Sequence, residues 1–209
     1  MRHFAAASLI CAASTTVAQT ELVIHVDADR QVVQPGESVN YTIWAELLEP
    51  EHEVLAVIQY FGFNLEFGNT DLIITDNEFQ STFDNDFFGP ADDGDAIGDS
   101  IIGARGENTI PPLNNPGGPD SSNPLQIYSF RVTVPSDTGF GSYTPMLSLW
   151  GEISGAYVGS PFPVILWYQS TGTVPHTPFR VEADTIYVPT PSASLILVCT
   201  GLFATRRKR

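Results

Sequence analysis

The residues best suited to chemistry form a run of aspartates in the middle of the chain. No lysine or arginine occurs between Arg30 and Arg105. Ca²⁺ takes about six to eight oxygen ligands, which carboxylates in such a segment can supply. The spacing does not match an EF-hand loop, so the run is either a Ca²⁺ site or a solvated acidic segment, and we favour the second interpretation. The candidate ligands are Asp84, Asp86, Asp92, Asp93, Asp95 and Asp99.

Patterns typical of enzymes are incomplete. His52 and Glu53 begin a His-Glu-x-x-His zinc pattern, but Ala56 stands where the second histidine is needed. Both cysteines, Cys11 and Cys199, lie near the ends of the chain, so the residues between them have no disulfide and no catalytic thiolate. No Gly-x-Ser-x-Gly elbow occurs. We therefore predict no catalytic residues and no enzyme activity.

Aromatic residues are the second candidate set. Trp44, Trp150 and Trp167 could stack against sugars, although such residues more often fill the core of a β-sandwich. Trp44 is the exception, because it alternates with Tyr41, Ile43 and Ala45 and so falls on the polar face of its strand. Trp44 is therefore the candidate ligand-binding residue.

The charge distribution limits the partners. The chain has nine basic and 24 acidic residues, and five of the basic residues lie in the two terminal segments. Residues 19–187 keep four arginines against all 24 acids, a net charge of −20. Such a surface repels nucleic acid and anionic headgroups. We predict no nucleic-acid partner.

The N-terminal residues have the pattern of a secretory signal. Arg2 and His3 precede an apolar, alanine-rich stretch, and Thr16 and Ala18 place small residues at the −3 and −1 positions of a cleavage site. We predict a signal helix over residues 1–18 and an exported domain over residues 19–187.

The C-terminal segment has three parts. A proline-containing motif is followed by 13 apolar or small residues, 193–205, which as a helix would be about 20 Å long. A basic cluster ends the chain and should stay cytoplasmic, which leaves the domain outside. We predict a short transmembrane helix within residues 188–209. The motif residues are Val188, Pro189, Thr190 and Pro191, and the basic residues are Arg206, Arg207, Lys208 and Arg209.

This three-part segment resembles the PEP-CTERM sorting signal of bacteria, with Thr190 in place of the usual glutamate between the prolines. The resemblance implies an exosortase-type processing enzyme as partner. It also implies transient anchoring in the inner membrane, followed by release to the cell surface or the extracellular matrix.

The residues between the ends predict an all-β domain. Alternating patterns indicate strands near residues 21–27, 39–45, 128–134, 142–150, 164–169 and 179–188, and Pro35-Gly36 indicates a turn. Residues 54–67 suit a strand buried on both faces with a bend at Gly62, and residues 105–123 suit a long irregular loop. We predict a single antiparallel β-sandwich.

The order of these features is similar to the cohesin and carbohydrate-binding-module superfamily of jelly-roll-like sandwiches. The similarity lies in residues 33–39, in residues 58–67 followed by 71–74, and in residues 125–134 followed by 139–144. Members bind dockerin modules, glycans or other surface proteins. The resemblance implies a non-catalytic module that contacts a protein or a polysaccharide; the alternatives are a carbohydrate-binding module and a shallow-site extracellular hydrolase.

Overall fold

The described part of the chain is all-β. The computed structural model describes residues 21–48, 56–68, 71–83, 85–86, 89–108, 120, 122–149, 153–157, 166–169 and 179–190, some of them by their backbone alone. The signal helix and the C-terminal helix that the sequence predicts lie outside these residues. No helix within the described ranges is long and apolar enough to cross a membrane.

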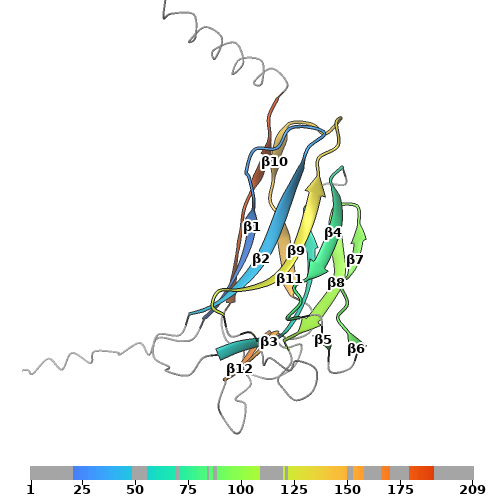
Figure 1. The fold of residues 1–209 in the computed structure, drawn as a ribbon. Helices are drawn as coiled ribbons and strands as arrows, with labels where there is room; N and C mark the ends of the chain where they lie inside the picture. The colour runs from blue at the N-terminus through green and yellow to red at the C-terminus, as the bar shows by residue number, and fades with distance from the viewer. Residues whose placement is uncertain are drawn as a thin grey trace, which may run out of the picture.

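Two sheets form the sandwich (Figure 1). The first sheet has the strand order β14 (Phe179–Ala183), β1 (Glu21–Ala28), β2 (Ser38–Leu48), β9 (Leu125–Thr133) and β4 (Ile73–Phe79). The second has the order β13 (Leu166–Gln169), β12 (Ile153–Tyr157), β3 (Ala56–Glu66), β8 (Ser100–Glu107) and β7 (Asp95–Ile97), and β11 (Met146–Leu149) also pairs with β3. Two small sheets pair β10 (Gly141–Tyr143) with β15 (Ile186–Val188), and β5 (Asn85–Asp86) with β6 (Gly89–Pro90). The all-β prediction is confirmed.

One strand pair corrects the prediction of a purely antiparallel sandwich. β14 lies parallel to β1, with Leu22 opposite Phe179 and Val26 opposite Ala183. The returning chain reaches the sheet at the end where β1 begins and covers the open edge of β1, which protects that edge from pairing with another molecule. β15 then continues in the same direction, so the described chain starts and leaves at opposite ends of the sandwich (Figure 1).

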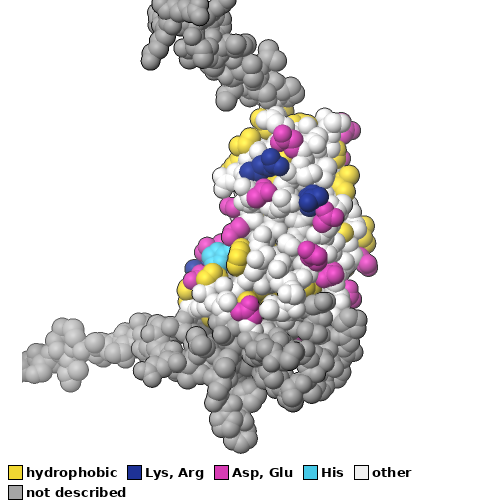
Figure 2. Space-filling view, in the orientation of Figure 1, with side chains coloured by type: hydrophobic (Ala, Val, Ile, Leu, Met, Phe, Trp, Pro, Cys, Tyr) yellow, Lys and Arg dark blue, Asp and Glu magenta, His cyan; other side chains and the backbone are white. Residues whose placement is uncertain are grey.

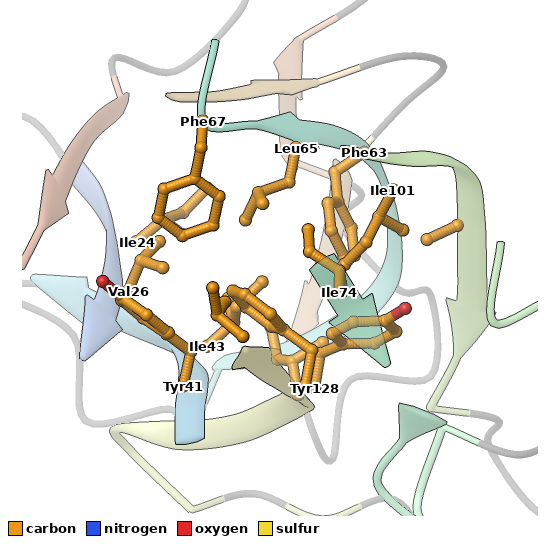
Figure 3. Packing of buried hydrophobic residues seen from close by; sticks show 14 of the residues in the cluster. Ile24, Val26, Tyr41, Ile43, Phe63, Leu65, Phe67, Ile74, Ile101 and Tyr128 are labelled. Carbon is orange, nitrogen blue, oxygen red and sulfur yellow. The ribbon is translucent and has the colours of Figure 1, made fainter. Parts of the chain in front are cut away.

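Alternation of side chains places the core as the sequence predicts. In β2, Val39, Tyr41 and Ile43 are fully buried, and in β9 Tyr128, Phe130 and Val132 face the same interior. The two sheets meet through aromatic rings: Phe63 of β3 lies edge-on to Tyr128, with ring centroids 4.9 Å apart. Figure 3 shows Tyr41, Phe63 and Tyr128 among the side chains that point into the space between the two sheets. Burial of each large apolar side chain contributes about 1.5–3 kcal/mol.

The first turn is also confirmed. Gly36 has φ +89°, a conformation that glycine adopts without strain, and Glu37 N donates to Gln34 O at 3.0 Å. Backbone bonds between this turn and Val134 then attach the start of β2 to the end of β9.

β3 differs from its prediction. From Phe63 onward it alternates, with Leu65 buried and Glu66 exposed, so in this half only one face is buried. Gly62 pairs regularly with Arg105, and the register between β3 and β8 shifts one step later, between Phe63 and Leu65. At that shift Asn64 Oδ1 accepts a hydrogen bond from Gly103 N at 2.7 Å. The side chain thus replaces the backbone acceptor that Gly103 lacks where the strand pairing is irregular.

Three boundaries also differ from the predictions. β8 continues to Glu107, so the irregular loop that was expected from residue 105 starts later. The strand expected over residues 179–188 is divided into β14 and β15 at Asp184, whose carboxylate accepts from Ala28 N at 3.1 Å. Val188, expected in the sorting motif, pairs with Gly141 and is 3% exposed. The folded domain therefore includes Val188.

We predict that Phe63→Ala lowers the free energy of unfolding by about 3–5 kcal/mol, because it removes a ring that is fully buried between the sheets. Phe140→Ala, at a position 73% exposed, should change it by no more than about 0.5 kcal/mol. Urea unfolding of both variants measures the difference. Equal losses would contradict the assignment of Phe63 to the core.

Candidate functional site

Two aspartates of the acidic run make hydrogen bonds with the backbone of neighbouring strands and turns. Asp92 exchanges two backbone hydrogen bonds with Arg105 of β8, at 2.9 and 2.8 Å, and its Oδ1 accepts from Gly94 N at 3.1 Å. Asp93 Oδ1 accepts from Phe79 N at 2.8 Å, at the end of β4. The backbone of Asp92 and the carboxylate of Asp93 therefore attach the segment before β7 to β8 and to β4, one strand of each sheet.

Asn77 and Tyr128 hold the same segment from the other side. Asn77 Nδ2 lies 2.9 Å from Asp93 O and 3.0 Å from the Tyr128 hydroxyl, and that hydroxyl donates to Asp93 O. Burial raises the pKa of Tyr128 far above its usual range, so the phenol remains a donor at neutral pH. At Gly94, φ is +78° and an added Cβ would lie 2.8 Å from Ala104 N, so this close approach requires glycine.

A Ca²⁺ site is the less favoured interpretation of the acidic run, and the aspartates that the structure describes form no cluster of three ligands. No group of three or more metal-ligating side chains occurs among the residues that the structure describes. Asp95 is exposed on β7, whereas Asp99 is nearly buried and accepts from the Ser100 hydroxyl at 3.1 Å. Asp84 lies outside the described residues, and Asp86 is described by its backbone alone. Of the six candidate ligands, Asp92 and Asp93 each accept a hydrogen bond from a backbone amide.

Trp44 lies where the sequence predicts, on the outer face of the first sheet. It is partly exposed, whereas Ile43 and Ala45 beside it are buried. Its partner in β9 is Gln126, and the register between β2 and β9 shifts at this point because Ile127 and Tyr128 both face the core. Bulges of this kind change the direction of side chains and are common beside binding sites.

Trp44 lines an open pocket of about 350 Å³. The other walls come from the segment after β4, from residues 120–124 and from the start of β9. The residues that line it are Trp44, Gln80, Ser81, Thr82, Asp120, Ser122, Pro124, Leu125 and Gln126. Among the described lining residues Asp120 alone is charged, so this part of the pocket is polar and weakly acidic.

Two asparagines fix the segment that forms one wall of the pocket. Asn123 donates to Leu47 O at 2.8 Å and accepts from Leu47 N at 2.9 Å, which extends the β2–β9 ladder through a side chain. Asn108, fully buried, makes the same paired contact with the backbone of Asp120, at 2.9 and 3.0 Å. Asp120 Oδ1 in turn accepts from the Ser122 amide and hydroxyl. The wall is therefore held before any ligand arrives.

A second surface feature was missed by the sequence reasoning. On the β7–β8 hairpin, Ile97 is 64% exposed and Ile102 is 50% exposed, and Asp95 pairs with Ile102. We name Asp95, Ile97 and Ile102 the hairpin patch. The sequence signal was the pair Ile101-Ile102, since adjacent residues of a regular strand point to opposite faces of the sheet.

Acidic side chains dominate the described surface. Figure 2 shows many carboxylates and few basic side chains on the displayed face. Arg180 pairs with Glu21 at 2.6 Å and with Glu182 at 2.8 Å, and Arg131 pairs with Asp76 at 2.8 Å. The Arg180 guanidinium lowers the pKa of Glu182. Arg131 and Arg180 thus pair with acidic residues of the same domain, whose net charge stays negative.

The structure describes only some of the residues that the sequence assigns to the sorting signal. Val188 belongs to β15, and Pro189 and Thr190 follow it at the end of the described chain. Pro191 and the basic residues Arg206, Arg207, Lys208 and Arg209 lie outside the described residues, as does the apolar segment between them.

Comparison with known proteins identifies the fold class. No family model matches the chain, and no curated protein matches it. The seventh ScaB type I cohesin from Pseudobacteroides cellulosolvens is similar over 82% of this chain and 93% of its own, with 14% identity and a TM-score of 0.53. A cohesin–dockerin complex from Clostridium thermocellum matches 80% of this chain and 99% of its own, with 11% identity and a TM-score of 0.48.

The similarity to the Pseudobacteroides cohesin indicates a cohesin-like β-sandwich, as the sequence resemblance implies. At 14% identity the likeness to the Pseudobacteroides cohesin concerns the fold alone. Function therefore has to be argued from the surfaces of this chain.

We predict that Asp93→Ala destabilises the domain by about 1–3 kcal/mol, because it leaves Phe79 N without its acceptor. Asp93→Asn keeps an acceptor oxygen and should retain most of the stability. Thermal unfolding of the two variants at the same pH makes the comparison. Equal destabilisation would mean that the charge of Asp93, rather than its hydrogen bond, stabilises the segment.

Proposed function

We propose that this chain is a non-catalytic, exported module that binds another protein at the cell surface or in the extracellular matrix. The observation that carries the proposal is a cohesin-like sandwich whose β7–β8 hairpin turns two isoleucines outward. Cohesins are interaction modules, and the sequence resemblance points the same way. The exposed isoleucines give this chain a surface of its own for such a contact.

The hairpin patch combines apolar area with negative charge. Aliphatic side chains as exposed as Ile97 and Ile102 lose hydration when a partner covers them, which favours association. Asp92, Asp93 and Asp95 are exposed on the same segment, in a domain of net charge −20. A partner that presents aliphatic residues beside lysine or arginine would complement this surface and would be attracted to it from a distance.

The ends of the chain supply the route to the surface. Residues 1–18 direct export, and the segment that follows Val188 holds the chain in the inner membrane until an exosortase-type enzyme cleaves near Pro189-Thr190-Pro191. β15 leaves the sandwich at the end opposite Glu21, so an anchor after Val188 would attach the domain by one end only. The rest of the sandwich would then project from the membrane.

The export proposal predicts two cleavages. Mass spectrometry of the protein from its own cells should find a chain that begins at Gln19 and lacks the apolar segment and the residues Arg206 to Arg209. Replacement of the four terminal basic residues by alanine should reduce the amount released, because the positive charges orient the helix. Recovery of an intact chain of 209 residues from the cytosol would contradict the proposal.

The contact proposal predicts a partner that depends on the hairpin patch. Proteins of the cell surface that bind the immobilised chain are identified and purified, and their affinity is measured by calorimetry. Ile97→Ser with Ile102→Ser should weaken binding at least about tenfold, since two apolar contacts of about 1 kcal/mol or more are lost. Val32→Ser with Phe140→Ser, two exposed apolar positions outside the patch, is the matched control.

Equal affinity of the wild type and the patch variant would place the contact elsewhere on the domain. If no purified surface protein binds the chain at all, a protein-contact function is wrong.

A further inference from the structure

The Trp44 pocket has an aromatic wall that core packing does not explain. Trp44 is partly exposed on the outer face of β2, while the aromatic core of the sandwich lies on the opposite face, with Tyr41 stacked on Phe130 at 5.1 Å. A tryptophan ring is a large, flat, apolar surface with a polar edge. It suits a ligand that has a flat apolar face and polar groups around its rim.

The remaining walls carry groups that both donate and accept hydrogen bonds. Gln80 and Gln126 have side-chain amides, and Ser81, Thr82 and Ser122 have hydroxyls. A ligand hydroxyl also donates and accepts, so a ligand rich in hydroxyls can pair with this lining in many orientations. An aliphatic ligand would leave the same groups without partners, at a cost in free energy.

Charge excludes anionic occupants. Asp120 lines the pocket, and none of the four arginines of the domain is among the described lining residues. Because the domain carries a net charge of −20, a phosphate, a sulfate or a uronic acid would be repelled. A neutral ligand meets no such barrier.

The pocket is preorganised. Asn123 joins its wall to Leu47 of β2, Asn108 holds the backbone of Asp120, and Gln80 N donates to Ile127 O at 2.9 Å. Binding therefore needs little ordering of the chain, which favours affinity in a small site.

We propose that the Trp44 pocket binds a neutral saccharide, with a sugar ring against Trp44 and its hydroxyls paired with Gln80, Gln126 and Asp120. A volume of about 350 Å³ lies at the small end of the range for ligand pockets and suits roughly one or two sugar rings. Trp44 lies in the second half of β2, toward Leu48 and away from the end of the domain where β15 leaves. The site is separate from the hairpin patch and goes beyond the proposed contact function.

Calorimetry of the full chain with cellobiose, maltose and N,N′-diacetylchitobiose tests the site, with digalacturonate as the anionic comparison. At least one neutral disaccharide should bind, and digalacturonate should bind at least about tenfold more weakly. Trp44→Ala and Gln126→Ala should each weaken the neutral sugar at least about tenfold. Phe140→Ala, which removes an exposed ring outside the pocket, should leave the affinity unchanged.

The melting temperature of each variant is measured to show that it is folded. If Trp44→Ala unfolds the domain, the affinity of Gln126→Ala tests whether the pocket binds the sugar. The proposal is overturned if none of the three neutral disaccharides binds, or if binding survives in the folded pocket variants. Because the hairpin patch variant leaves the pocket intact, a failed protein contact and a failed sugar site give different results.

Discussion

The packing of Tyr128 between the two sheets is the interaction on which the rest of the structure depends. Its ring lies 4.9 Å from that of Phe63 and 4.8 Å from that of Phe79, so a single side chain joins β9 to β3 and β4. Its hydroxyl donates a hydrogen bond to Asp93 O, in the segment before β7. Residues 19–187 have no cysteine. The domain therefore has no disulfide, and aromatic contacts of this kind hold the sheets together.

The same contact explains the form of the acidic segment. The side chains of Tyr128 and Asn77 donate hydrogen bonds to Asp93 O, and Asn77 also donates to Gly94 O. Asp92 pairs with the backbone of Arg105. Carboxylates that a sequence alone suggests as cation ligands are here acceptors for amides. With the segment fixed in this way, β7 pairs with β8 in a register that turns Ile97 and Ile102 outward. The hairpin patch is thus a consequence of how the core is closed.

The Trp44 pocket arises beside Tyr128, at the start of β9. Ile127 and Tyr128 both enter the core, and the resulting shift in the β2–β9 register places Trp44 opposite Gln126. The segment that Asn108 and Asn123 hold supplies the adjoining wall of this pocket. One irregularity in β9 therefore serves the core on one face and shapes a pocket on the other.

The sequence by itself determined the all-β class, the turn at Gly36, the inner faces of β2 and β9 and the outward position of Trp44, because each follows from a period of two or from local backbone preference. Tertiary structure alone decided the parallel pairing of β14 with β1, the inclusion of Val188 in a sheet and the use of Asp92 and Asp93 as backbone acceptors. It also brought Asp120, Gln80 and Trp44, far apart in the chain, into one pocket. Strand direction, register and such meetings depend on contacts between distant segments, and a local pattern carries no information about which segments meet.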